Sequence, residues 1–297
     1  MFDSHHAIPL IFGEVLFDCF PDGNAVLGGA PFNVAWHLQA FGLSPLVVSS
    51  IGNDALGRKV ESAMLDWNMT TTAMQHDASH PTGSVDIVFN DGEPSYSIVE
   101  HRAYDYIDAA LLPPLPDHSL LYHGTLALRN PVSRDALASL KAQHSSTVFM
   151  DVNLRDPWWE RGFVLRLVDE ADWVKLNEDE LTRLGRSMGS IETQANAFIG
   201  SHRLRGLVVT LGDKGAIAVT DKGNIARVSP SESLDVTDTV GAGDAFTAVF
   251  ITGLILDWPL DLRLQRAQNF ASMIVGRQGA TVHDHQFYQA MITDWGL

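Results

Sequence analysis

The sequence has little cysteine and little positive charge. Cys19 is its only cysteine, which excludes a disulfide framework within the chain and is typical of a reducing compartment. Lys and Arg number 20 against 36 Asp and Glu, giving a formal net charge of −16. This balance argues against a nucleic-acid partner, because no basic face is available to neutralise phosphates. An anionic ligand must therefore be bound by local groups rather than by the overall field.

Long apolar runs are also lacking. No run approaches the roughly 20 residues needed to span a bilayer, and the segment Met1–His6 has no basic region followed by an apolar core. We therefore expect no signal peptide, no membrane partner and a cytoplasmic location.

The chain contains neither Gly-x-x-x-x-Gly-Lys-Ser/Thr nor Gly-x-Gly-x-x-Gly, so neither a P-loop nor a Rossmann fingerprint is indicated. Cys19 is expected to be a small buried residue next to a strand, not a nucleophile.

The most informative stretch that is present runs from Asp238 to Asp244 (Asp-Thr-Val-Gly-Ala-Gly-Asp). After it, apolar residues at Phe246, Val249 and Phe250 have the spacing of a helix with one buried face. The glycines therefore precede a helix N-terminus, where backbone N–H groups lack intrahelical partners and the helix dipole is positive. Without a Cβ, such a turn lets an anion approach the backbone. The pattern predicts a phosphate-binding turn.

Asp244 stands in the first turn of that helix, and two interpretations compete for it. The carboxylate either complements the helix dipole, which is worth less than about 1 kcal/mol, or acts as a general base beside the anion site. Spacing alone leaves both open.

The remaining pattern alternates buried strands with helices, which predicts an α/β fold. A continuous strand is expected over Ile8–Phe17, ending at Asp18, where a side chain can reach a ligand beyond the end of the sheet. Residues 83–99 differ, because they form a half-polar hairpin around Asp91-Gly92. This hairpin suggests a small sheet that projects from the main body, although a plain surface hairpin is the alternative. Further strands are expected at 45–51, 120–124, 147–153, 173–177 and 207–211.

The motif at 238–246 resembles the C-terminal signature of the ribokinase-like sugar kinases, the phosphofructokinase-B superfamily. Leu27–Ala35 (Leu-Gly-Gly-Ala-Pro-Phe-Asn-Val-Ala) is similar to its N-terminal signature, and the resemblance extends from about Phe12 to about Asp284. It implies a single kinase domain over residues 1–297 with a three-layer α/β/α fold, a central mostly parallel sheet and a small β-sheet lid. The lid strands would come from residues 12–27 and 83–100, and the lid would also form the contact of a homodimer.

The resemblance assigns roles to particular residues. Asp244 becomes the catalytic base, and the backbone of Gly241, Ala242 and Gly243 becomes the anion hole for the transferring γ-phosphate of ATP. The residues implied in substrate binding are Asp18, Gly28, Gly29, Asn33, Asn153 and Arg155.

A nucleotide and metal region is implied in the C-terminal half. Asn177 and Glu180 have the spacing of a helix capping box, and in the family they also shape the magnesium and phosphate site, with Glu180 acting through water. Many relatives bind a potassium ion at positions matching Asp238, Val240 and Gly279. The implied nucleotide-binding residues are Asn177, Glu180, Thr210, Gly212, Gly215 and either Gln268 or Asn269.

The implied reaction is transfer of the γ-phosphoryl group of ATP to a primary hydroxyl of a monosaccharide. Gly13–Asp18, Gly28–Ala35 and Asp151–Arg155 together favour the fructokinase branch over 2-keto-3-deoxygluconate kinase, ribokinase and nucleoside kinase. Phosphorylated sugars are disfavoured, because Arg102 is a lone basic candidate. A catalytically silent sugar-binding regulatory protein is the alternative from a different class.

Overall fold

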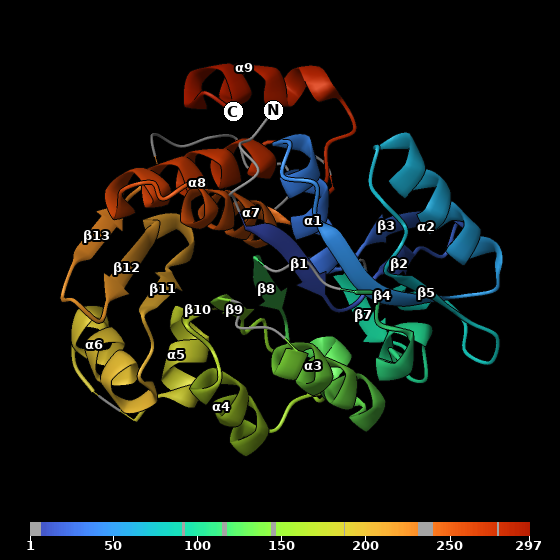
Figure 1. The fold of residues 1–297 in the computed structure, drawn as a ribbon, viewed down its shortest axis with the longest axis horizontal. Coiled ribbons are helices and arrows are strands. Elements are labelled where there is room, and N and C mark those ends of the chain that lie inside the picture. Colours follow the sequence, from blue (N-terminus) through green and yellow to red (C-terminus); the bar gives the residue numbers. More distant parts are fainter. Residues whose placement is uncertain are drawn as a thin grey trace. The chain divides into compact units, whose positions relative to one another are not determined.

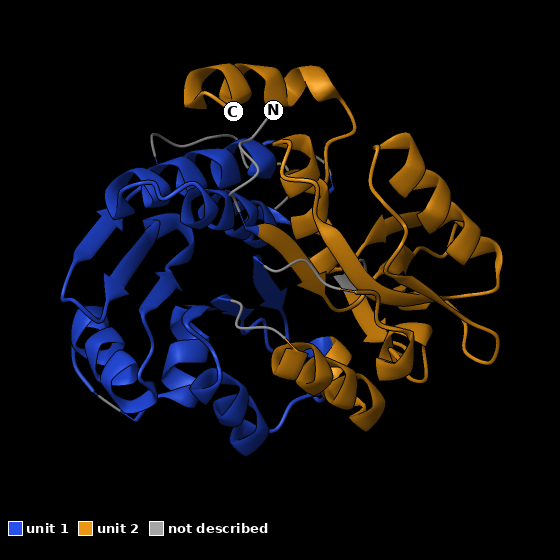
Figure 2. Cartoon of the chain, viewed as in Figure 1, with its two compact units in different colours: residues 1–7, 118–126, 146–280 blue, residues 8–117, 127–145, 281–297 orange. Residues whose placement is uncertain are grey.

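The computed structural model describes residues 7–90, 93–114, 118–143, 147–186, 188–230, 240–277 and 279–297. The chain divides into two compact units (Figure 2). Unit 1 comprises residues 1–7, 118–126 and 146–280, and unit 2 comprises residues 8–117, 127–145 and 281–297.

Unit 1 contains six neighbouring strands in the order β13-β12-β11-β10-β9-β8. The strands from β8 to β11 are parallel, whereas β12 and β13 are antiparallel to their neighbours. Nearly every residue of β8 to β12 is buried, as expected of strands with helices on both faces. Their bounds are β8 Ser119–His123, β9 Thr147–Asp151, β10 Trp173–Asn177, β11 Gly206–Thr210, β12 Ala216–Thr220 and β13 Ile225–Val228.

The helices of unit 1 cover its strands on two sides (Figure 1). Helices α7 (Ala242–Ile255) and α8 (Leu260–Val275) lie on one side of β10 to β13, and α4 to α6 lie on the other. Helix α7 is buried from Ala245 to Gly253, so the core fixes its position and leaves its first turn at the surface. The other bounds are α4 Arg161–Asp169, α5 Glu178–Leu184, α6 Ile191–His202 and the 3-10 turn η4 Gly212–Lys214.

Unit 2 contains a parallel set of strands in the order β1-β4-β5: Ile8–Phe12, Leu46–Gly52 and Met74–Asp77. Its helices are α1 Ala30–Ala40, α2 Ala55–Asp66, α3 Pro131–Gln143 and α9 His285–Trp295. The 3-10 turns η1 Ala103–Tyr106 and η2 Ala109–Leu111 also belong to it, and η3 spans Leu126–Arg129. Helix α1 is buried along its length from Pro31 to Leu38, rather than on one stripe.

A separate four-stranded sheet in unit 2 has the order β3-β2-β6-β7, with bounds Ala25–Gly28, Leu16–Cys19, Gly83–Asn90 and Glu93–Ile98. Strands β6 and β7 pair antiparallel, which confirms the predicted hairpin, and Asp91-Gly92 lie outside the described residues. Asp18, Val26, Val85, Ile87 and Tyr96 share one face of this sheet by register.

The prediction of one continuous strand over Ile8–Phe17 is wrong. Strand β1 ends at Phe12 and β2 begins at Leu16, and the two strands belong to different sheets. The chain changes sheet at Gly13, whose φ of 150° and close approach to the ring of Pro31 leave no room for a side chain. Asp18 therefore lies within the small sheet, not beyond the end of a strand in the parallel set.

Cys19 is the last residue of β2 and is half-buried, not fully buried as predicted. Burial, together with the negative charges of Asp86 and Asp18, raises the pKa of its thiol. The thiol is therefore protonated and weakly nucleophilic at neutral pH. None of the helices described in the structure is long and apolar enough to cross a bilayer.

Candidate active site

The first turn of α7 forms a bare backbone turn at the surface of unit 1. Gly241 precedes the helix with φ of 78°, a left-handed conformation, and as a glycine it has no side chain with which to cap the helix N-terminus. A Cβ at Gly241 would collide with Cα and Cβ of Ala280, so only glycine fits. Asp244 is the acidic residue of this first turn. The arrangement combines a glycine turn at a helix N-terminus with a first-turn carboxylate, as the sequence predicted.

A buried charged network lies directly under this turn. Nζ of Lys175, in β10, donates to Oδ2 of Asp151 at 2.7 Å. The hydroxyl of Thr247 donates to the same oxygen at 3.0 Å and lies 2.9 Å from the carbonyl oxygen of Gly243. Lys175 is 7% exposed and Asp151 is 2% exposed. The network thus joins β9 and β10 to the first turn of α7.

Lys175 carries its charge beside the turn. Burial alone would lower its pKa, but Asp151, through charge and the hydrogen bond, together with Asp244 and Glu180, raises the pKa above its ordinary value. The ammonium is therefore protonated at neutral pH. Its Nζ lies 3.6 Å from the point where a Cβ of Gly243 would stand. A cation at this place strengthens the attraction of the turn for a phosphate.

Lys175 and Thr247 were not among the residues singled out from the sequence. The available signal was a lysine inside Trp173-Val174-Lys175-Leu176, an otherwise apolar strand of a parallel sheet. A charged side chain at such a position is buried and requires a partner. The identity of that partner, Asp151, depends on the register of β9 against β10, where Lys175 stands opposite Asp151.

The predicted capping box is confirmed at the start of α5. The backbone N–H of Glu180 donates to Oδ1 of Asn177 at 2.8 Å, and the N–H of Asn177 donates to Oε2 of Glu180 at 2.9 Å. Oε1 of Glu180 accepts from the N–H of Leu154 at 2.7 Å. Glu180 therefore ties α5 to the loop after β9, which carries Asn153 and Arg155.

Glu180 is 6% exposed. This burial raises the pKa of its carboxyl, while the N–H groups of Asn177 and Leu154 oppose the shift. Each oxygen accepts one N–H, and an ionised carboxylate has about four lone-pair sites. The donor set thus fits a metal-bound water as a further partner. Among the described residues, no group of three or more His, Cys, Asp or Glu side chains is arranged to hold a metal ion directly.

A cavity of about 460 Å³ lies beside the capping box. Three of the predicted nucleotide-binding residues, Asn177, Thr210 and Gly212, line it together. Gly215 is not in this lining; it has φ of 92° and its backbone lies against the carbonyl of Val228. The described residues that line it are Asn177, Glu178, Asp179, Thr182, Thr210, Leu211 and Gly212.

The other predicted residues of the C-terminal half are distributed differently. Gln268 is buried and donates to the hydroxyl of Ser272, whereas Asn269 is exposed and accepts from Gln265. Asp238 lies outside the described residues. The backbone contact of Gly241 with Ala280 brings the chain around Val240 next to the chain around Gly279.

The predicted sugar-binding residues Asp18, Gly28, Gly29 and Asn33 come together in unit 2. Gly29 precedes α1 with φ of 105°, and a Cβ there would stand 2.7 Å from the carbonyl oxygen of Glu14. Oδ1 of the buried Asn33, in the first turn of α1, lies 3.9 Å from the Cβ position of Gly28. By register, Asp18 and Gly28 belong to the same face of the small sheet. Asn153 and Arg155 belong to unit 1.

Comparison with known proteins assigns this chain to a family. Fructokinase of Escherichia coli is 28% identical over 258 residues, covering 82% of this chain and 83% of the relative. Aminoimidazole riboside kinase of Salmonella typhimurium is 29% identical and covers 80% of this chain and 77% of the relative. The structure of a fructokinase from Vibrio cholerae O395, in a form with fructose, ADP and calcium ion bound, has a TM-score of 0.79 at 27% identity. The match covers 93% of this chain and 95% of the fructokinase chain.

These similarities confirm the predicted fold class, the ribokinase-like α/β fold with a mostly parallel sheet and a small separate sheet. The family model for pfkB family carbohydrate kinases matches residues 20–285, which include both signature motifs. The chain belongs to the pfkB family of carbohydrate kinases.

Proposed function

We propose that this protein transfers the γ-phosphoryl group of ATP to a primary hydroxyl of a monosaccharide, with fructose as the first candidate. The observation that carries the proposal is the first turn of α7. There, the helix N-terminus, the Asp244 carboxylate and the buried Lys175 ammonium are gathered within unit 1. Phosphoryl transfer depends on positioning and electrostatic stabilisation, and these groups supply both.

In the proposed reaction, Asp244 accepts the proton of the sugar hydroxyl. The hydroxyl oxygen forms a bond to the γ-phosphorus while the bond to the β–γ bridging oxygen breaks, so that ADP leaves. Negative charge on the transferring group is met by the N–H groups of the Gly241–Asp244 turn and by the Lys175 ammonium below them. The absence of a side chain at Gly243 keeps that ammonium within reach of the turn.

A bound Mg²⁺ would neutralise charge on the β- and γ-phosphate oxygens. We assign Glu180 to hold it through water, because this carboxylate is fixed by two N–H groups and retains acceptor capacity. The adjacency of the backbone around Val240 and Gly279 supports a potassium site there. Asn177, Thr210 and Gly212 are assigned to the nucleotide, because they line one cavity.

Fructose is favoured over other sugars by the names of the relatives, several of which are fructokinases. Asp18 and Asn33 are assigned to its hydroxyls, which require acceptor and amide groups of this kind. Aminoimidazole riboside kinase is a relative at similar identity, so a riboside is the second candidate substrate. We further propose that the small sheet of unit 2 acts as the lid and the dimer contact.

The test is ATP consumption against fructose, 2-keto-3-deoxygluconate, ribose, glucose, adenosine and aminoimidazole riboside. We expect the highest kcat/KM with fructose. A higher kcat/KM with another sugar would support the same mechanism and identify that sugar as the substrate. Binding of a sugar by calorimetry, without turnover of any member of the panel, would favour the silent regulatory protein instead.

A further inference from the structure

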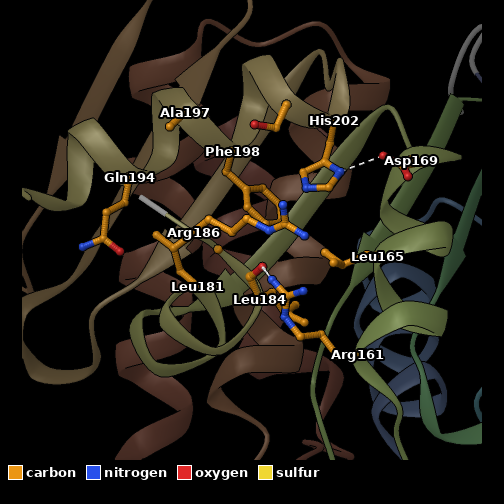
Figure 3. Close-up of a pocket in the computed structure, with 12 residues that line it drawn as sticks. Arg161, Leu165, Asp169, Leu181, Leu184, Arg186, Gln194, Ala197, Phe198 and His202 are labelled. Carbon is orange, nitrogen blue, oxygen red and sulfur yellow. Dashed lines mark hydrogen bonds and ion pairs between the residues drawn. The ribbon is translucent and has the colours of Figure 1, made fainter. Parts of the chain in front are cut away.

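A second cavity in unit 1 contains none of the residues assigned to catalysis. It has a volume of about 500 Å³ and lies between α4, α5 and α6 (Figure 3). The apolar part of its wall is formed by Leu165, Leu181, Leu184 and Phe198. Pockets for small molecules typically measure about 300–1,000 Å³ and combine apolar walls with a few polar groups. This cavity has the size and lining of such a pocket.

The polar side chains of the lining include two arginines and a histidine. Figure 3 shows the side chains of Arg161, Arg186 and His202 gathered around the same space. Asp169 is the one acid among the described residues of the lining, and Nδ1 of His202 is hydrogen-bonded to its Oδ1 at 2.7 Å. The lining therefore contains two guanidinium groups and one carboxylate, and that carboxylate already has a hydrogen-bond partner. This local positive charge contrasts with the net charge of −16 for the whole chain.

Arg161 is held in place by the end of α5. Its Nε donates to the carbonyl oxygen of Arg183 at 3.2 Å, and its Nη2 donates to that of Leu184 at 2.6 Å. Arginine has five N–H donors, so three remain for a ligand. Arg186 is exposed, and its planar guanidinium can bind a carboxylate or phosphate with two parallel hydrogen bonds.

We propose that this cavity binds a small organic anion, a phosphate monoester or carboxylate on an apolar body, which acts as an effector of the enzyme. Arg186 and Arg161 would bind the anionic group, and the leucines and Phe198 would cover the apolar body. An inorganic anion would make no contact with the apolar side chains, and a neutral molecule would form no ion pair with the guanidinium groups.

The route from this cavity to the nucleotide region is α5. Leu181 and Leu184 line the cavity, and Glu180, the residue before Leu181, forms the capping box and binds Leu154. Helix α5 has only seven residues, about 10 Å in length, so an occupant at one end can shift the other. The effector part of the proposal rests on the proposed role of Glu180 and Asn177 in nucleotide binding, whereas the binding part does not.

Isothermal titration calorimetry with phenyl phosphate tests the site, in the presence of saturating ADP so that the nucleotide region is occupied. Benzyl alcohol serves as the neutral probe and inorganic phosphate as the probe without an apolar body. We expect phenyl phosphate to bind most tightly, and Arg186→Gln to raise its Kd at least tenfold. Ala197→Trp, which fills the cavity from an exposed position on α6, should do the same.

Arg166→Gln is the matched control, because Arg166 is an exposed arginine of α4 that does not line the cavity. Its Kd for phenyl phosphate should equal that of the unaltered protein. Equal Kd values in the Arg186→Gln variant and the unaltered protein, or no binding in the presence of ADP, would overturn the proposal.

The coupling is tested by titrating ADP with and without phenyl phosphate. We expect the Kd for ADP to change at least threefold in the unaltered protein and not in Arg186→Gln. Phenyl phosphate binding with an unchanged Kd for ADP would overturn the effector role. A protein that binds phenyl phosphate but no nucleotide would instead overturn the proposed kinase function, so the two failures are distinguishable.

Discussion

The ammonium group of Lys175 lies 2.7 Å from the carboxylate of Asp151, and both groups are buried beneath the first turn of α7. The same carboxylate oxygen accepts the hydroxyl of Thr247, a residue of α7. A buried charge pair costs desolvation energy and by itself contributes little net stability. Its position under the Gly241–Asp244 turn gives it a catalytic role in the proposed mechanism.

Replacing Lys175 with Met should lower kcat by about 10²–10³, the usual loss when one preorganised group of an anion-binding site is removed. It should also destabilise the fold by about 3–5 kcal/mol, because Asp151 remains buried without its counter-charge. Kinase assays and chemical denaturation measure the two effects.

A double variant that combines Lys175→Met with Asp151→Asn separates them. The amide introduced by the second change carries no charge, and its oxygen can still accept from Thr247, so most of the stability should return. The kcat should stay low, because the cation is still missing. Recovery of activity together with stability would show that Lys175 is only structural.

Asp244→Asn should lower kcat by about 10²–10⁴, because the amide cannot accept the hydroxyl proton. Asp261→Asn is the matched control: Asp261 is the first-turn acid of the adjacent helix α8. Both changes remove a first-turn carboxylate, whose interaction with the helix dipole is worth less than about 1 kcal/mol. If both variants retain full activity, Asp244 is a helix-terminal carboxylate and not the base.

Gly241→Ala should abolish activity and destabilise the protein, because its Cβ collides with the backbone of Ala280. Gly223→Ala is the matched control. Gly223 has φ of 77°, against 78° at Gly241, and nothing lies within 4 Å of its Cβ position. The control should lose only about 1–2 kcal/mol of folding stability, the cost of placing an alanine in the left-handed conformation. A similar decrease in Tm in both variants would mean that Ala280 moves to accommodate the new side chain.

Stability should decline at acidic pH partly through Asp54. Its carboxylate accepts the N–H of Gly57, the N–H of Thr82 and the hydroxyl of Thr82, each at 2.8 Å. Burial alone would raise its pKa, but these hydrogen bonds lower the pKa below the usual value. A lowered folded-state pKa gives stability that is fully present above the unfolded pKa of about 3.9 and lost as the pH falls through the folded pKa.

Tm measured between about pH 2 and 5 should therefore depend less steeply on pH in Asp54→Asn than in the unaltered protein. Asp294→Asn, at an exposed position of α9, should leave the profile unchanged. If Tm depends on pH as steeply in Asp54→Asn as in the unaltered protein, the acid sensitivity arises from other carboxylates.

The proposed dimer contact is testable on the small sheet. Val26 and Tyr96 share the face that carries Asp18, and they are 47% and 59% exposed. Exposed apolar side chains on one sheet face favour association. Light scattering should therefore report a dimer that Tyr96→Lys converts to a monomer. Leu65→Lys, at a 63% exposed position of α2, should leave the mass unchanged; a monomeric unaltered protein would contradict the contact.

Much of the fold followed from local pattern. The buried strands, the helix after Gly241 and the Asn177–Glu180 capping box depend on residues close together in the chain, so periodicity and spacing predicted them. The break at Gly13 was missed, because apolar residues continue across it and a single glycine gives no sign of which sheet each half will join. Lys175 was missed as a site residue because its partners, Asp151 and Thr247, are distant in sequence.

By itself, the sequence determined the alternation of strands and helices, the bare glycine turn before α7 and the presence of an acid in its first turn. These features arise from side-chain size, polarity and spacing along one segment. Only the tertiary structure decided that Lys175 neutralises Asp151 beneath that turn, that Ala280 restricts position 241 to glycine, and that Arg161 and Arg186 border one cavity. Such relationships depend on strand register and helix packing, which bring together groups far apart in the chain.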